Sequence, residues 1–173
     1  GLRGVQAGDA SVAEVCSVTV VDLSIRIVDA TGIAGPATMV MPLLASFSAP
    51  VEAYDISLQY PGDLLDVNDV TVDGTVAGDL NAEQVLVDVG DTATGFITAQ
   101  VIMDAGPPFA GQEIPVGDDQ PILLFDFAVA ASGFVDGETR ELNFVDGLGP
   151  DQVENRIILD GISYAPGVDG AVI

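Results

Sequence analysis

Apolar and polar residues alternate with a period of two along most of the chain, whereas the 3.6-residue period of an amphipathic helix is scarce. The clearest example is the segment YDISLQY, residues 54–60, which a Pro-Gly pair ends. Its large side chains share one face of a strand: Tyr54, Ile56, Leu58 and Tyr60. The pattern therefore predicts an all-β protein.

The alternating segments are short and are separated by turns rich in Gly, Asp and Pro. They cover residues 18–27, 37–47, 54–60, 67–73, 84–89, 95–103, 122–131, 140–146, 155–165 and 168–173. Many short strands with turn signals between them are typical of β-sandwiches. We therefore predict a jelly-roll β-sandwich of about nine strands, formed as a single domain by residues 18–173.

Some segments differ from this alternation. The run ILLF at the start of residues 122–131 predicts a strand that is buried on both faces and central in its sheet. The Pro- and Gly-rich residues 105–121 predict a long connection before it. The segment DLNAEQVL, residues 79–86, is the one plausible short helix, with Asp79 as its N-cap. Residues 1–17 predict an N-terminal arm, a linker or a strand that is donated to another subunit.

Acidic residues dominate the charge of the chain. The 27 Asp and Glu stand against four Arg and no Lys, which gives a formal net charge of −23 at pH 7. A field of this sign repels phosphate backbones and anionic lipid surfaces. The apolar runs are far shorter than the roughly 18 residues that a membrane-spanning helix needs. We therefore expect neither nucleic-acid binding nor membrane insertion.

The residues that most enzymes use for catalysis are missing from the chain. It has no His and no Lys, which excludes Ser-His, Cys-His and Schiff-base mechanisms. The single cysteine, Cys16, lies in an apolar segment, where the role of a small buried side chain is expected. Two carboxylates can serve a glycosidase, but among 27 acidic residues some pair always falls at a workable distance. We predict that the protein is not an enzyme.

Oxygen ligands are abundant, which favours calcium over zinc, because zinc prefers His and Cys. Three clusters carry them: Asp63, Asp66, Asn68, Asp69 and Asp73; Asp118 and Asp119; and Asp146, Asp151, Glu154 and Asn155. The third cluster is the best calcium candidate, because its Gly-rich loop between two strands can add carbonyl ligands. The same acidic residues also fit a hydrated surface or an adaptation to high salt.

Aromatic residues are few, and the chain has no Trp. Most fall at inward positions of the expected strands, so we expect them in the core: Tyr54, Tyr60, Phe125, Phe127 and Phe144. Tyr164 alone is ambiguous. A carbohydrate-binding module needs an aromatic platform, and this class is therefore only a second alternative.

Three stretches resemble the cohesin family, whose members bind dockerins in cellulosomes and related cell-surface assemblies. GPATMVMPLLASF, residues 35–47, is similar to an early cohesin strand. YDISLQYPGDLLDV, residues 54–67, is similar to the next strand and its turn, with matching positions at Tyr60, Pro61 and Leu64 or Leu65. ILLFDFAVAASG and GETRELNF, within residues 122–144, resemble a later pair of strands, and the likeness spans residues 18–173.

The resemblance implies a jelly roll that does no chemistry and binds a dockerin-like protein through one flat sheet face and the adjoining loops. The leading hypothesis is therefore an extracellular or cell-surface module for protein interaction and assembly. The alternative is a homo-oligomer or polymer, in which residues 1–17 of one copy complete the sheet of the next in a filament or surface layer. Calcium would then bridge the like-charged copies.

Overall fold

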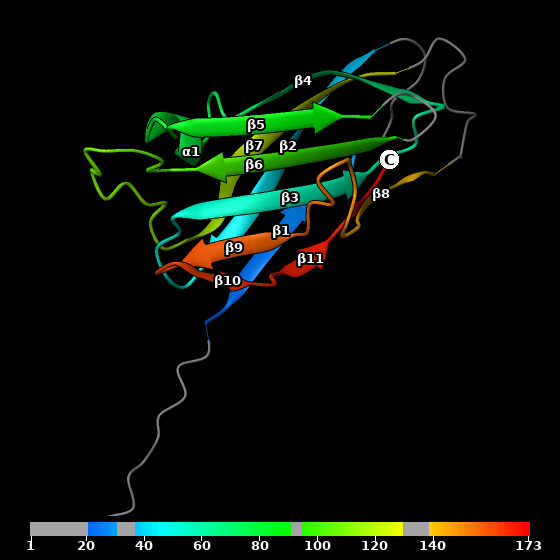
Figure 1. Ribbon diagram of the computed structural model, residues 1–173. Coiled ribbons are helices and arrows are strands. Elements are labelled where there is room, and N and C mark those ends of the chain that lie inside the picture. Colours follow the sequence, from blue (N-terminus) through cyan, green and yellow to red (C-terminus); the bar gives the residue numbers. More distant parts are fainter. Residues whose placement is uncertain (1–20, 31–36, 91–94, 130–138) are drawn as a thin grey trace, which may run out of the picture.

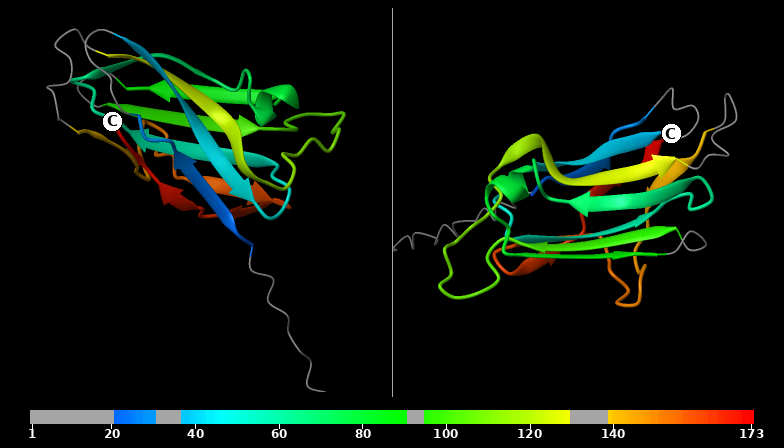
Figure 2. Two further views of the ribbon diagram at one scale, coloured as in Figure 1. Left: turned by 180° about the vertical axis from the view of Figure 1, so that it is seen from behind. Right: turned by 90° about the horizontal axis from the view of Figure 1, so that it is seen from above.

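The computed structural model describes residues 21–30, 37–90, 95–129 and 139–173. These residues form two β-sheets that lie face to face, with one short helix at their side (Figures 1 and 2). The architecture confirms the prediction of an all-β sandwich. Both the expected arm, residues 1–17, and Cys16 lie outside the described residues.

The smaller sheet has five strands in the order β11-β1-β2-β7-β4. Their bounds are Leu23–Ile27 for β1, Thr38–Phe47 for β2, Leu65–Thr71 for β4, Gly117–Val129 for β7 and Gly167–Asp169 for β11. The β1–β11 pair is parallel and the other pairs are antiparallel.

The larger sheet has the order β10-β9-β3-β6-β5, and β8 joins it by pairing with both β3 and β12. The bounds are Ala53–Gln59 for β3, Gln84–Val89 for β5, Phe96–Ile102 for β6, Glu141–Phe144 for β8, Arg156–Leu159 for β9, Ile162–Tyr164 for β10 and Ala171–Val172 for β12. The last three strands, β10 to β12, have only two or three residues each. The other strands of the described ranges, β1 to β9, match the expected number of about nine.

The core lies between the two sheets, where the alternating large residues meet. The aromatics expected in the core lie in it or against it: Tyr54, Tyr60, Phe125, Phe127 and Phe144. Tyr164, which was ambiguous from the sequence, also packs against the core. The rings of Tyr60 and Phe127 have their centroids 5.6 Å apart. Burial raises the pKa of Tyr54, whose hydroxyl donates to the Ile122 carbonyl at 2.5 Å. The aromatics thus fill the core, as the alternation predicts.

A β-bulge at Ile122 explains the apolar run at the start of β7. The register with β2 shifts just after the pair Leu43–Leu123, so that Ile122 has no partner on that strand. Ile122 and Leu123 are both fully buried, whereas Leu124 is partly exposed. The prediction of burial on both faces was wrong, because the bulge turns two successive side chains inward. The predicted interior place of β7 is confirmed, since β7 lies between β2 and β4.

A second bulge decides where the aspartates of β4 point. The register with β7 shifts at Asn68, whose side-chain amide donates to an Asp126 carboxylate oxygen at 3.2 Å. The extra residue restores the apolar side chains of β4 to the core side. Asp66 and Asp69 are consequently exposed on the outer face of the smaller sheet.

The helix α1, Val76–Asp79, begins earlier than the sequence predicts. Its N-cap is Thr75, whose hydroxyl accepts a hydrogen bond from the Gly78 amide and also donates to the Val72 carbonyl at 2.6 Å. Asp79 therefore ends the helix, and the prediction that it caps one was wrong. Among the described residues, no helix has the length and apolar character needed to cross a membrane.

Candidate functional site

The outer face of the larger sheet carries a row of side chains that crosses four strands. Strand register places Arg156 of β9, Asp55 of β3, Gln100 of β6 and Leu86 of β5 side by side. The neighbours of Asp55 along β3 point into the core, so Asp55 itself must point outward. This cross-strand row combines a cation, a carboxylate, an amide and an apolar side chain on one surface. The strands that carry it, β9, β3, β6 and β5, face the viewer in Figure 1.

Asp55 is the partly buried ionisable group of the cross-strand row. The carboxyl is partly buried, and this desolvation raises its pKa above the ordinary value. The Gln100 amide, which donates to Asp55 Oδ1 at 3.3 Å, and the charge of Arg156 lower the pKa, but by less. Burial is therefore the largest influence on the pKa of this carboxyl.

We expect Asp55→Asn to increase the free energy of unfolding at neutral pH. The raised pKa means that the folded protein holds the proton more tightly than the unfolded chain, so ionisation of Asp55 costs stability as the pH rises. The gain should therefore be present at pH 7 and absent near pH 3, below the ordinary pKa of about 3.9. Urea unfolding of both proteins at the two pH values measures it, and an equal gain at both would contradict it.

The loop between β8 and β9, residues 145–155, covers the middle of β3 on the same outer face (Figure 2). Both flanking strands pair with β3, β8 near its end and β9 near its start. Between them, the Ser57 amide donates to Asn155 Oδ1 at 2.8 Å, and the Ser57 carbonyl accepts a hydrogen bond from the Val145 amide at 3.1 Å. The stapled loop, as we call residues 145–155, thus replaces the strand partner that β3 lacks at Ser57.

Asn155 is the anchor of the stapled loop. Its backbone amide and its side-chain amide both donate to Asp146 Oδ1, at 2.8 and 2.9 Å. Gly149 lies against β6, where an added β-carbon would approach the Phe96 ring to 3.3 Å. The loop is therefore fixed to two neighbouring strands of the larger sheet.

The four residues predicted to bind calcium all belong to the stapled loop, and the structure brings two of them together. Asp146 and Asn155 are joined by hydrogen bonds, whereas Glu154 forms an ion pair with Arg156, and Asp151 is exposed. In the part of the chain that the structure describes, no three His, Cys, Asp or Glu residues converge as a metal site requires. Calcium binding by this loop stays a prediction.

The outer face of the smaller sheet has a different character. Asp66 and Asp69 are exposed there, and Arg26 donates to Asp119 Oδ1 at 3.0 Å. The Arg26 guanidinium holds the pKa of the Asp119 carboxyl below its ordinary value. These charged groups are exposed and hydrated, which favours a solvent-facing role for this sheet.

The edge of β5 is open to a further strand. This strand pairs with β6 alone among the described residues. Three apolar residues of β5 are exposed: Leu86, Val87 and Val89. An edge of this kind can accept a strand from another chain.

The sequence does not reveal the cross-strand row as a whole, but it does predict the outward orientation of Asp55. Asp55 alternates with the core residues of its strand, and this parity marks it as outward-facing. The pairing of β3 with β9 on one side and β6 on the other joins segments that are far apart in the chain. Nothing local in the sequence places Arg156 and Gln100 beside Asp55.

No family model and no curated protein sequence matches the chain. Solved structures do match, and many of them are cohesins. The cohesin of a type I cohesin–dockerin complex from Clostridium thermocellum has a TM-score of 0.66 at 14% identity, and the alignment covers 87% of this chain and 96% of that chain. The cohesin CaCohA2 from Clostridium acetobutylicum has a TM-score of 0.64 at 15% identity, with coverages of 88% and 90%.

A third match comes from an archaeon. The non-cellulosomal cohesin from the hyperthermophile Archaeoglobus fulgidus has a TM-score of 0.58 at 13% identity, with coverages of 87% and 88%. At these identities the similarity shows the fold. The chain therefore has a cohesin-like fold, which confirms the resemblance seen in its sequence.

Proposed function

We propose that this chain is a non-catalytic interaction module that binds a dockerin-like protein with the outer face of its larger sheet, in an extracellular or cell-surface assembly. The observation that carries the proposal is the cross-strand row, in which Asp55 is partly desolvated and Leu86 is 50% exposed. Polar groups beside exposed apolar area are typical of protein interfaces. The fold is shared with cohesins that have been solved in complex with dockerins.

The absence of His and Lys supports a binding role over a catalytic one. The outer faces of the two sheets also differ in the side chains that they expose. The smaller sheet presents hydrated carboxylates such as Asp66 and Asp69, whereas the larger sheet presents a mixed surface flanked by the stapled loop. The partly buried Asp55 and the exposed Leu86 give the larger sheet both polar and apolar contacts for a partner, which favours this sheet.

We expect Leu86→Arg to abolish or strongly weaken binding to a dockerin, because it places a bulky cation at the end of the cross-strand row. Val40→Arg is the matched control, since Val40 is 59% exposed on the outer face of the smaller sheet. The same charge change there should leave binding intact. A pull-down against a panel of calcium-loaded dockerins measures both variants. If no dockerin is retained by the unmodified protein, or if both variants lose binding equally, the proposal is wrong.

The second candidate function is self-assembly by strand donation, which the open edge of β5 favours. A donated strand from residues 1–17 of another copy would complete this edge, and calcium would bridge the like-charged copies. We expect the full chain to form large species in calcium, and a chain that lacks residues 1–17 to stay monomeric. Size-exclusion chromatography with and without calcium measures this. A monomeric full chain under both conditions would contradict strand donation and calcium bridging together.

A further inference from the structure

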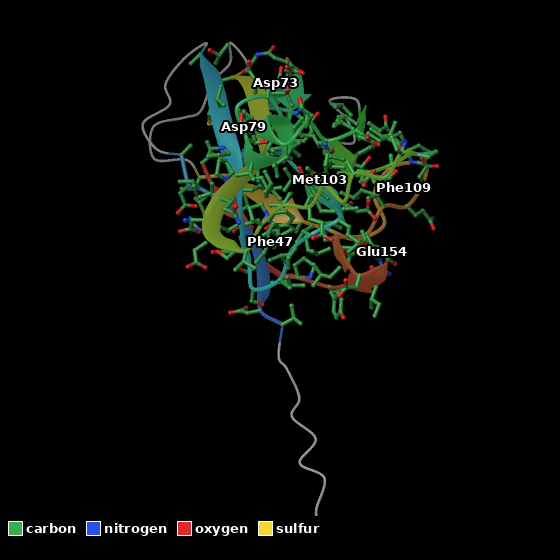
Figure 3. All side chains as sticks on the ribbon, turned by 90° about the vertical axis from the view of Figure 1, so that its left-hand side faces the viewer. Phe47, Asp73, Asp79, Met103, Phe109 and Glu154 are labelled. Atoms are coloured by element: carbon green, nitrogen blue, oxygen red, sulfur yellow. The ribbon has the colours of Figure 1, made fainter. Side chains whose placement is uncertain are left out.

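A hollow of about 400 Å³ lies at one end of the outer face of the larger sheet, where β3 begins and β6 ends. Its apolar floor comes from three neighbouring strands: Ala53, Ile102 and Ile158. Phe109, on the connection from β6 to β7, stands beside this floor and is 72% exposed. Figure 3 shows Phe109 on the outer side of the molecule, on the same side as Glu154 and away from Phe47 of the core.

The polar side chains around the hollow are three carboxylates and one amide: Glu52, Asp104, Glu113 and Gln112. Asp104 Oδ1 and Gln112 Oε1 are buried and have no hydrogen-bond partner. Buried oxygens without a donor are costly, and native structures hold few of them. Among the described residues that line the hollow, none is basic. The hollow therefore lacks positive charge and has an excess of negative charge.

The wall that carries these oxygens is held in place from several directions. The other carboxylate oxygen of Asp104, Oδ2, accepts a hydrogen bond from the Gly111 amide at 2.6 Å. Glu83 Oε2 accepts hydrogen bonds from the amides of Ala105 and Gly106, at 2.8 and 3.0 Å. Two backbone hydrogen bonds join Ile114 to Val51 beyond the far end of the wall. The hollow is thus formed before any partner arrives, which lowers the entropic cost of binding.

We propose that this hollow binds an arginine side chain of the protein partner, an inference that rests on the proposed function. The aliphatic stem of an arginine covers the apolar floor at Ile102 and Ile158. Its guanidinium pairs with the carboxylates that line the hollow, Asp104 among them, and the Phe109 ring offers a face for stacking. A bare metal ion leaves the floor and the ring unused, and the carboxylates repel an anion.

The test is a titration of the ¹⁵N-labelled full chain with N-acetyl-arginine N-methylamide, followed by amide chemical shifts. The matched ligand is the citrulline analogue, which has nearly the same shape and no charge. We expect the arginine compound alone to shift the amides of Gly111, Ile102 and Ile158. Shifts of equal size with both ligands, or shifts elsewhere only, would overturn the proposal.

Two variants separate a specific site from general attraction to an acidic protein. Asp104→Asn should weaken arginine binding about tenfold, because it removes a charge-assisted hydrogen bond. Asp118→Asn removes the same unit of charge from an exposed position on β7 and should leave binding unchanged. Phe109→Ala should weaken binding about two- to fivefold. Equal weakening by the two Asp variants would overturn the proposal. A titration in which calcium causes the same amide shifts and displaces the arginine compound would also overturn it.

The two proposals fail in different ways. If a dockerin binds but Asp104→Asn changes neither dockerin nor arginine binding, the arginine site is wrong and the interaction module stands. If arginine binding depends on Asp104 but no dockerin binds, the dockerin-like partner is wrong and the preference of the hollow stands. Loss of dockerin binding in both Asp104→Asn and Leu86→Arg, with Asp118→Asn and Val40→Arg unaffected, supports both proposals.

Discussion

Asn155→Asp is expected to lower the free energy of unfolding at pH 7 by about 3–5 kcal/mol, because it leaves an uncompensated charge in a buried position. Asn155 is 7% exposed, and its side-chain amide donates to Asp146 Oδ1 at 2.9 Å. A carboxylate of the same shape would face the Asp146 carboxylate with no proton to share. The Ser57 amide would still find a carboxylate oxygen as its acceptor, so the loss comes from the contact with Asp146 at the base of the stapled loop. Urea unfolding followed by circular dichroism measures the loss.

The loss should depend on pH in a defined direction. Burial and the charge of Asp146 both raise the pKa of the introduced carboxyl in the folded state. The destabilisation is therefore complete above this raised pKa and disappears as the pH falls below the ordinary value of about 3.9. Asn143→Asp is the matched control, since Asn143 is exposed and also donates to a carboxylate, Glu141 Oε2, at 3.3 Å. Equal losses in the two variants would show that burial is not the cause.

Gly95→Ala is the second substitution with a large expected effect, a loss of about 2–4 kcal/mol in the free energy of unfolding. Gly95 has φ +51°, and an added β-carbon would collide with the Tyr60 carbonyl oxygen. The two backbones cannot simply move apart, because the Tyr60 amide donates to the Gly95 carbonyl at 2.8 Å. The substitution therefore combines the cost of a left-handed conformation with that of overpacking.

Gly74→Ala isolates the conformational part of that cost. Gly74 has φ +76°, but no atom beyond its two chain neighbours lies within 4 Å of the position of an added β-carbon. We expect this variant to lose only about 1–2 kcal/mol, the cost of the left-handed conformation for an L-residue. Thermal and urea unfolding of the two variants compare them directly. If Gly95→Ala lowers the free energy of unfolding by no more than Gly74→Ala does, the collision with the Tyr60 carbonyl oxygen contributes nothing to the loss.

The Gly95 contact also bears on the surface that we propose for binding. Gly95 directly precedes β6, whose residue Gln100 belongs to the cross-strand row. Its hydrogen bond to Tyr60 fixes the start of β6 beside the end of β3. A partner that spans both strands therefore meets a surface that is already ordered, and ordering costs on binding are small.

Alternation along the chain determined the fold class and most of the core. Residues such as Ile56 and Leu58 can only share a face if the segment is a strand, and apolar side chains on one face need a second layer to cover them. The same parity marks Asp55 as outward-facing. These are consequences of local backbone geometry, which a sequence expresses directly.

The tertiary structure alone decided the register, the caps and the candidate sites. The bulges at Ile122 and Asn68 depend on partner strands, and Thr75 rather than Asp79 caps the helix, with a further hydrogen bond from its hydroxyl to the distant Ile122 carbonyl. The hollow beside Phe109 joins residues from four segments of the chain. Which strands become neighbours depends on the packing of the whole sandwich, and for that reason no short stretch of sequence encodes the surface that we propose for binding.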